Sequence, residues 1–223
     1  MNIYWGIQQE NNETPSRKRR RLNDSIDEDV LFGKKKLFEM DDELIYSFGT
    51  EVHFTGPIDK NSIATVIKEI TKVINEKNSD EYDKNKKFTV CYIVDSPGGC
   101  VTSVLKFVDF LDIVRQKHPN VEFVSIGTGL IASAGTIMCA VADKRYITKN
   151  SYAMIHELSS GNVGKFTHLV SYTKYLSQMH DRLVDIYLQK STMKKDEIEA
   201  LLKDESWFNA QEYLEKGLID EVK

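Results

Sequence analysis

Three short segments of the chain carry residue types that together can perform acyl-transfer chemistry. Ser133 lies among small residues in the segment 129–136, Gly98 and Gly99 belong to a Ser-Pro-Gly-Gly turn, and His156 follows an apolar run. A serine hydroxyl becomes a useful nucleophile when a base takes its proton and backbone N–H groups stabilise the negative charge that develops. These segments therefore predict a nucleophile, an oxyanion site and a base.

Each segment also has an ordinary structural interpretation. Most Pro-Gly-Gly sequences are turns, and a serine that begins a helix, as Ser133 would, is ordinarily an N-cap. A lone histidine such as His156 is more often a hydrogen-bonded, partly buried side chain than a base. The four other histidines form no metal-ligand pattern. The chemical interpretation therefore requires Ser133 and His156 to meet in space.

The elements that must position these residues are predicted from apolar periodicity. Short apolar, β-branched runs predict strands at 88–94 and 121–126, with shorter ones near 52–58, 145–148 and 153–155. A turn is expected from Gly127. Apolar residues at three- and four-residue spacing predict helices at 63–74, 101–114 and 166–190. Further helices are expected from about Ser133, at 195–202, and at 210–216, where Gly217 would end the helix. Strands that alternate with helices indicate an α/β domain.

Composition narrows the class of protein. The 223 residues are 41% hydrophobic, which suffices for a buried core, and the formal net charge of −4 gives no general attraction to nucleic acid or anionic membranes. The three cysteines show neither a disulfide pattern nor metal-ligand spacing, so we expect reduced thiols. No apolar run approaches the ~20 residues of a membrane-spanning helix. A soluble intracellular protein, without a membrane partner, is expected.

Residues 1–40 differ from the rest of the chain. They are largely polar and charged, with the basic run 17–21 followed by the acidic stretch 24–29. Such a composition is poor material for a packed core and predicts a flexible N-terminal extension. The basic run is interpreted as a solvated charge run, with a nuclear-import or nucleic-acid patch as the alternative.

Five segments, in this order, resemble the ClpP family of proteolytic subunits. They are residues 54–58, 95–99, 132–135, 154–156 and 210–220, and the resemblance covers roughly residues 45–222. It implies an α/β domain of the ClpP/crotonase fold over residues 41–223, with repeated β-β-α units and a projecting long helix. It also implies a serine endopeptidase that needs no metal or cofactor. Residues 1–40 would then be a propeptide or an axial loop.

The resemblance assigns roles at the matching positions. Ser133 is expected to be the nucleophile and His156 the general base. Backbone N–H groups at Gly98, Gly99 and Ala134 are expected to form the oxyanion hole.

Further roles follow from the same resemblance. Val101 and Leu158 are expected to flank a substrate that binds as an extended strand. The helix 166–190 is expected to mediate stacking of heptameric rings.

The chain departs from the family pattern at two positions. The triad acid is usually an aspartate, and counting back from residues 207–210 places Glu205 there, with Asp204 as the alternative acid. Glu157 follows His156 where the family commonly has glutamine, and its charge is expected to raise the pKa of the histidine.

The expected function is hydrolysis of peptides, and of unfolded proteins when an AAA+ unfoldase ATPase is the partner. The expected location is the cytoplasm, with an organelle or the nucleus as alternatives. Two alternatives are a catalytically weak structural ring subunit and a crotonase-type acyl-CoA enzyme. The pairing of Ser133 with His156 disfavours the acyl-CoA enzyme.

Overall fold

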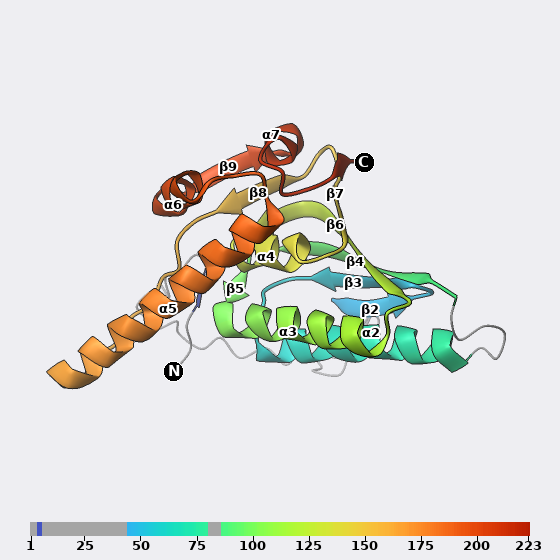
Figure 1. Cartoon of the computed structure of the whole chain (residues 1–223), viewed down its shortest axis with the longest axis horizontal. Helices are drawn as coiled ribbons and strands as arrows, with labels where there is room; N and C mark the ends of the chain where they lie inside the picture. The colour runs from blue at the N-terminus through green and yellow to red at the C-terminus, as the bar shows by residue number, and fades with distance from the viewer. Residues whose placement is uncertain (1–3, 6–43, 80–85) are drawn as a thin grey trace, which may run out of the picture. The chain divides into compact units, whose positions relative to one another are not determined.

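The computed structural model describes residues 4–5, 44–79 and 86–223, and an eight-stranded sheet forms its centre (Figure 1). Along the sheet the order is β10-β7-β6-β4-β3-β2, and β8 and β9 continue it from β6. The strands of this sheet are β2 (Ile45–Phe48), β3 (Glu51–Thr55), β4 (Phe88–Ser96), β6 (Val121–Ala132), β7 (Lys144–Ile147), β8 (Tyr152–Ile155), β9 (Ser206–Asn209) and β10 (Glu221–Val222).

Six helices occur in the described residues. They are α2 (Lys60–Ser79), α3 (Val101–Lys117), α4 (Ala134–Ala140), α5 (Phe166–Lys190), α6 (Lys195–Lys203) and α7 (Ala210–Glu215). Each of the predicted helices is therefore present, and the bounds predicted for α5 are confirmed. The mixed α/β fold expected from the resemblance is confirmed.

Parallel pairing of β3, β4, β6 and β7 brings the chemical segments to one edge of the sheet. Helix α2 connects β3 to β4, and α3 connects β4 to β6, as in other parallel sheets. The carboxyl ends of neighbouring parallel strands meet at the same edge, which is where ligands bind in open α/β sheets. The loop after β4 carries Gly98, and the residue after β6 is Ser133.

One strand is longer than its sequence indicates. We predicted that the strand beginning at Val121 ends at Ile126 and that a turn follows from Gly127, but β6 continues to Ala132. Beyond Gly127 the strand leaves β7 and pairs with β8, and it pairs with β4 again only after a register shift, with Ser96 opposite Ile131. Gly129, at φ 57°, permits this change of direction. The extension determines where the following residue, the predicted nucleophile, is placed.

Helix α5 has two different halves. Its C-terminal half packs into the core through Met179, Leu183 and Tyr187, whereas its N-terminal half extends away from the sheet (Figure 1). In the extended half Phe166 is 79% exposed and Val170 is 54% exposed. The apolar stripe predicted from the sequence is thus buried over only part of its length.

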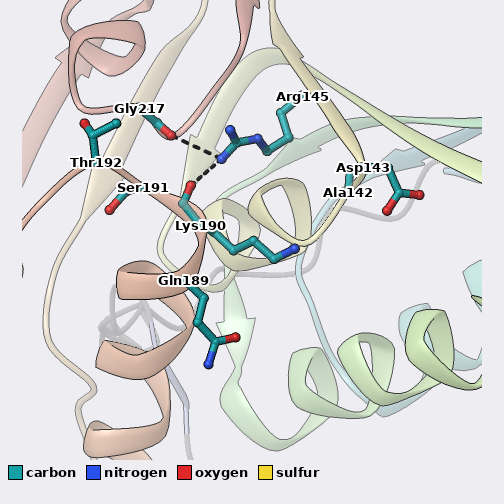
Figure 2. Close-up of a pocket in the computed structure, with 8 residues that line it drawn as sticks. All are labelled: Ala142, Asp143, Arg145, Gln189, Lys190, Ser191, Thr192 and Gly217. Atoms are coloured by element: carbon teal, nitrogen blue, oxygen red, sulfur yellow. Dashed lines mark hydrogen bonds between the residues drawn. The ribbon is translucent and has the colours of Figure 1, made fainter.

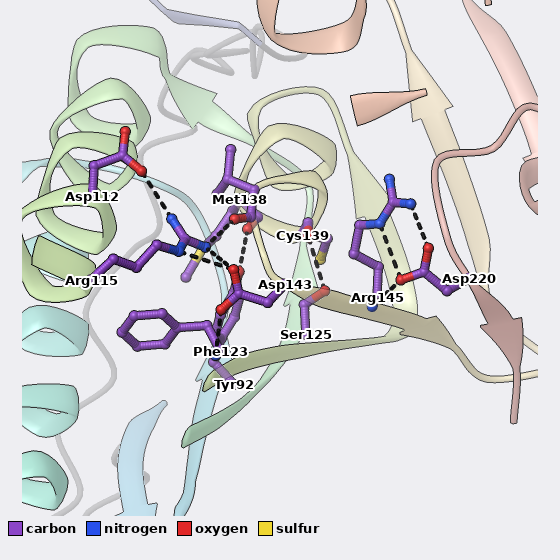
Figure 3. Close-up of polar contacts among 11 residues, drawn as sticks. Tyr92, Asp112, Arg115, Phe123, Ser125, Met138, Cys139, Asp143, Arg145 and Asp220 are labelled. Atoms are coloured by element: carbon purple, nitrogen blue, oxygen red, sulfur yellow. Dashed lines mark hydrogen bonds and ion pairs between the residues drawn. The ribbon is translucent and has the colours of Figure 1, made fainter. Parts of the chain in front are cut away.

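A charged network lies at the end of the sheet opposite to the one that carries Gly98 and Ser133 (Figure 3). Arg115 on α3 contacts Asp112 and Asp143 at 2.9 Å and donates to the Val141 carbonyl. The second oxygen of Asp143 accepts the N–H of Phe123 on β6 at 2.8 Å. Because a buried or half-buried arginine needs all its donors satisfied, this network ties α3, β6 and the end of α4 together.

The predicted boundary at residue 40 lies outside the described residues, as does the basic run 17–21. None of the helices in the described ranges is long and apolar enough to cross a membrane.

Candidate active site

Ser133 occupies a sharp turn between β6 and α4. Its φ of 58° and ψ of −123° make it the one non-glycine residue with positive φ in the described part of the chain. Such a conformation costs about 1–3 kcal/mol and persists only where surrounding contacts hold it. The Ser133 N–H donates to the Met154 carbonyl at 2.7 Å, and the Ser133 carbonyl accepts from the N–H and the hydroxyl of Thr136 at 3.0 and 2.6 Å. This arrangement resembles the strand-to-helix nucleophile turns of other hydrolases.

The Ser133 side chain contacts His156. The distance between Ser133 Oγ and His156 Nε2 is 3.0 Å, while the hydroxyl makes no capping bond to α4. Ser133 therefore stands at the N-cap position of α4, but its side chain does not cap the helix. A neutral imidazole that holds its proton on Nδ1 can accept the serine proton at Nε2, and this is the geometry that a general base needs.

Sheet register explains why two residues 23 positions apart meet. Strands β6 and β8 run parallel, with Ala132 opposite Met154. Ser133 directly follows β6, and His156 directly follows Ile155, the last residue of β8. Both side chains therefore leave the sheet at the same edge, and neither residue could be placed there from local sequence alone.

Gly98 lies against the serine. A Cβ at Gly98 would be 2.5 Å from Ser133 Cβ, 2.7 Å from the Ala132 carbonyl oxygen and 3.0 Å from the Ala134 nitrogen, and the φ of Gly98 is 90°. Only glycine fits this position. Gly98 therefore lies against both Ser133 and the backbone nitrogen of Ala134. In this conformation the Gly98 N–H donates to the buried Ser96 hydroxyl at 3.1 Å.

Glu205, the residue before β9, lies near His156. Strands β8 and β9 are antiparallel, with Ile155 opposite Ser206, so continuing the register by one residue puts Glu205 opposite His156. The charge of Glu205 raises the pKa of His156. Both carboxylates are exposed to solvent. Register and charge thus favour Glu205 over Asp204 as the partner of the histidine.

Burial has the largest effect on the histidine. It lowers the pKa of His156 below its ordinary value, against the opposing charges of Glu205 and Glu157. We predicted that Glu157 raises this pKa. Its effect has that sign, but desolvation of the imidazolium outweighs it, so the net direction is opposite to the one expected. A lowered pKa keeps the imidazole neutral near pH 7, as a base must be.

The two predicted substrate-flanking residues lie at different depths. Val101 is the first residue of α3, and its side chain is fully buried in the core. Leu158, two residues after His156, is partly buried against the same core. Only Leu158 therefore presents side-chain surface next to the site.

Sequence reasoning missed the residues that support the serine. The Thr136 hydroxyl contacts both the Ser133 carbonyl and the Tyr187 hydroxyl on α5, each at 2.6 Å. Thr136 stands three residues after Ser133, a spacing that one helical turn brings together, and this signal was available. Tyr187 shows no such signal, because in the sequence it is one more member of an apolar stripe.

A separate hollow, which Ser133 does not line, lies at the C-terminal end of α5 (Figure 2). It measures about 410 Å³ and is lined by Ala142, Asp143, Arg145, Gln189, Lys190, Ser191, Thr192 and Gly217. Arg145 donates there to the carbonyls of Lys190 and Gly217, and its guanidinium also pairs with Asp220. Its donors are thus occupied by the protein itself. Within the described ranges, no group of three or more His, Cys, Asp or Glu side chains is placed to hold a metal ion.

Comparison with known proteins gives consistent matches. The family model described as Clp protease matches residues 46–223. The ATP-dependent Clp protease proteolytic subunit 2 of Pseudomonas aeruginosa is 26% identical over 174 residues, which cover 77% of this chain and 80% of that protein. Two proteins named ATP-dependent Clp protease proteolytic subunit 1 match over 137 residues, or 60% of this chain. The one from Chlamydia trachomatis is 27% identical with 69% of its length covered, and the one from Protochlamydia amoebophila is 33% identical with 64% covered.

Proposed function

Because the chain belongs to the Clp protease family and is a serine-type peptidase, we propose that Ser133, His156 and Glu205 form its catalytic triad. The single observation that carries this proposal is the 3.0 Å contact between Ser133 Oγ and His156 Nε2 at a strained turn. The register that puts Glu205 opposite His156 supports the third member.

The proposed reaction has two halves. Ser133 Oγ attacks the carbonyl carbon of the scissile peptide bond while His156 Nε2 takes the hydroxyl proton. The C–N bond then breaks, His156 gives that proton to the leaving amine, and an acyl ester remains on Ser133. In the second half, His156 removes a proton from water and the resulting hydroxide attacks the ester carbonyl. The bond between the acyl carbon and Ser133 Oγ then breaks, the product leaves with a new carboxyl group, and His156 returns the proton to Ser133. Glu205 orients the imidazole and stabilises its charged form.

The oxyanion would be held by backbone donors. The proposed donors are the N–H groups of Gly98, which lies against Ser133 and the Ala134 nitrogen, of Ala134 itself, and of Gly99, which follows in the same turn. For Gly98 to serve, the Ser96 hydroxyl that now accepts its N–H must give way to the oxyanion. An oxyanion donor is typically worth roughly 10²–10³ in rate, and the Gly98 N–H would contribute this only after its bond to Ser96 is exchanged for one to the oxyanion.

The whole assembly is also proposed from the family. The relatives are named proteolytic subunits of ATP-dependent proteases, and we propose that this chain likewise forms stacked, heptameric rings that receive unfolded protein from an AAA+ ATPase. The exposed N-terminal half of α5, with Phe166 and Val170, supports a contact with another ring. The peptidase domain in this proposal is 41–223, its substrate is an extended polypeptide flanked by Leu158, and its location is the cytoplasm.

Labelling with a fluorophosphonate tests the nucleophile. The wild-type chain should gain the mass of one label and hydrolyse a fluorogenic peptide, and Ser133→Ala should do neither while it keeps its assembly state in size-exclusion chromatography. Ser177→Ala, an exposed serine of α5, is the matched control and should label like the wild type. Undiminished labelling of Ser133→Ala would refute the assignment, and an assembled wild type that never labels would identify a structural ring subunit instead. With the family established, nothing favours the acyl-CoA alternative.

A further inference from the structure

The N-terminus of the chain contributes a strand to the candidate active site. Residues Tyr4–Trp5 form β1, which pairs antiparallel with β5, Gly99–Cys100. In this register Trp5 lies opposite Gly99 and Tyr4 lies opposite Cys100. The polar composition of residues 1–40 gave no indication of a strand there, yet β5 directly follows Gly98 of the proposed oxyanion site.

Strand β5 has two edges, and each has an occupant. On one edge, Ile58 donates its N–H to the Gly98 carbonyl at 2.8 Å and accepts the Cys100 N–H at 2.7 Å. Backbone groups of successive residues in a strand point to opposite edges, so the N–H and carbonyl of Gly99 face the other side. That second edge is the one that β1 takes.

The second edge is where an extended polypeptide would bind. Peptides commonly bind by adding a strand to an exposed sheet edge, with main-chain hydrogen bonds providing the affinity. An added strand on β5 runs next to Gly98, which lies so close to Ser133 that a Cβ there would be 2.5 Å from the serine Cβ. Ile58 already pairs with Gly98 and Cys100 on the first edge. The N–H and carbonyl of Gly99, on the second edge, are therefore the groups that both β1 and a substrate strand need.

The first residues of the chain suit this role. Ile3, Tyr4, Trp5 and Ile7 are aromatic or β-branched, which are the residue types that favour strands, whereas residues 8–29 are mostly polar and charged. The strand-forming residues thus stand at the very start of a long polar segment.

We propose that Tyr4–Trp5 competes with substrate within the same chain. It occupies the edge of β5 to which a substrate strand would bind, and it thereby lowers the peptidase activity of the full chain. This inference rests on the proposed function, because it is Ser133 chemistry that the strand would obstruct. Substrate and β1 exclude one another on the Gly99 backbone, so removal of β1 should raise the apparent affinity for peptides.

A reversible cross-link tests the pairing itself. Directly opposite residues of antiparallel strands have Cα atoms about 4.5–5.5 Å apart, within the range of about 4.4–6.8 Å that a disulfide spans. The variant Tyr4→Cys should therefore form a disulfide with Cys100 when glutathione disulfide is added. Burial raises the pKa of the Cys100 thiol, but hydrogen bonds with Ser103 and Thr102 outweigh it and leave that pKa below its ordinary value. Burial raises the pKa of Cys91 to about 11 and that of Cys139 to about 12, which makes them poor competitors.

Two measurements test the pairing of β1 with β5 and its effect on peptide hydrolysis separately. Peptide mapping of full-length Tyr4→Cys should find residue 4 linked to Cys100, and the oxidised protein should hydrolyse a fluorogenic peptide at least 10-fold more slowly than the same protein after dithiothreitol. Trp5→Cys, whose partner is Gly99, and the double variant Tyr4→Cys/Cys100→Ser are the matched controls and should show no such redox dependence. A variant in which Met is followed directly by Gly6 should have a kcat/KM on the order of 10-fold above wild type, mainly through KM, because two main-chain hydrogen bonds no longer compete.

Two results would overturn the inference. One is failure of Tyr4→Cys to link to Cys100 while Cys100 reacts freely with iodoacetamide. The other is a disulfide that forms fully and leaves peptide hydrolysis unchanged. If no form of the protein, reduced or truncated, labels with fluorophosphonate, then the proposed function fails, and the mapped disulfide still decides whether β1 occupies β5.

Discussion

Ser133 and Glu205 stand on either side of His156 in opposite environments. Ser133 is completely buried, and its backbone is fixed by Met154 and Thr136. Glu205 is exposed, and it reaches the histidine through the register of two antiparallel strands at the end of the sheet. The nucleophile is thus held by the core, whereas the carboxylate is held by the pairing of one strand.

This difference shows where the site tolerates change. On the Gly98 side of Ser133 there is no space, since even a methyl group at Gly98 would overlap the serine Cβ. Around Glu205 there is solvent, which can accommodate an extra methylene and weakens the charge that the histidine senses. A departure from the usual aspartate is therefore less costly at this position than any change beside the serine would be.

The largest effect is expected from Gly98→Ala. The new Cβ would meet Ser133 Cβ at 2.5 Å and would force a backbone with φ of 90° onto an L side chain, so peptide hydrolysis should fall roughly 1000-fold. Gly161→Ala, where a Cβ meets nothing within 4 Å, is the matched control. Steady-state kinetics with circular dichroism as a check on folding measures this. A folded Gly98→Ala enzyme with near wild-type turnover would show that the serine side is as tolerant as the carboxylate side.

A smaller effect is expected at the carboxylate. Glu205→Gln removes the charge that stabilises the imidazolium, and kcat should fall about 100-fold, less than for a buried triad acid because this one is exposed. Asp204→Asn is the control and should change kcat less than about twofold. The reverse order of the two effects would make Asp204 the acid and would show that the register does not continue past Ser206.

The smallest effect concerns pH. A base must be neutral, so kcat/KM rises with pH through the pKa of His156, which burial has lowered. Glu157→Gln removes a negative charge that opposes burial, so the pKa falls further and the acid limb should move about 0.3 pH toward lower pH. Glu76→Gln on α2 serves as the control. Movement of the acid limb toward higher pH would mean that Glu157 acts through something other than its charge.

Much of the fold could be predicted because its elements are long and periodic. The helix 166–190 was predicted to its last residue, since it has no glycine or proline and its apolar residues recur regularly. Strand β9, residues 206–209, was missed because four residues that pair with β8 alone leave too short a pattern. The end of β6 was misplaced because Gly127 and Gly129 are typical of turns, while the tertiary pairing with β8 makes them part of a strand.

The candidate site also has features that could be predicted from the sequence and features that could not. The residue types and their order predicted Ser133, His156 and the Gly98 turn, and the geometry brings these three together. What the sequence could not show is anything that depends on contacts between distant elements. The support of Thr136 by Tyr187, the engagement of the Gly98 N–H by Ser96, and the dominance of burial over the two glutamates at His156 belong to that class.

Because Tyr187 forms a hydrogen bond with Thr136, a change of length in α5 affects the site only if it falls in the buried, C-terminal half of the helix. Each inserted residue lengthens a helix by about 1.5 Å and rotates the two parts that it separates by about 100° relative to each other. An insertion before Met179 therefore only lengthens the exposed half and leaves Tyr187 facing the serine turn. An insertion between Met179 and Tyr187 would rotate the tyrosine away from Thr136. The exposed N-terminal half of α5 can thus differ in length from one relative to another. The two turns from Met179 to Tyr187 cannot, because their length fixes the position of Tyr187 relative to the serine turn.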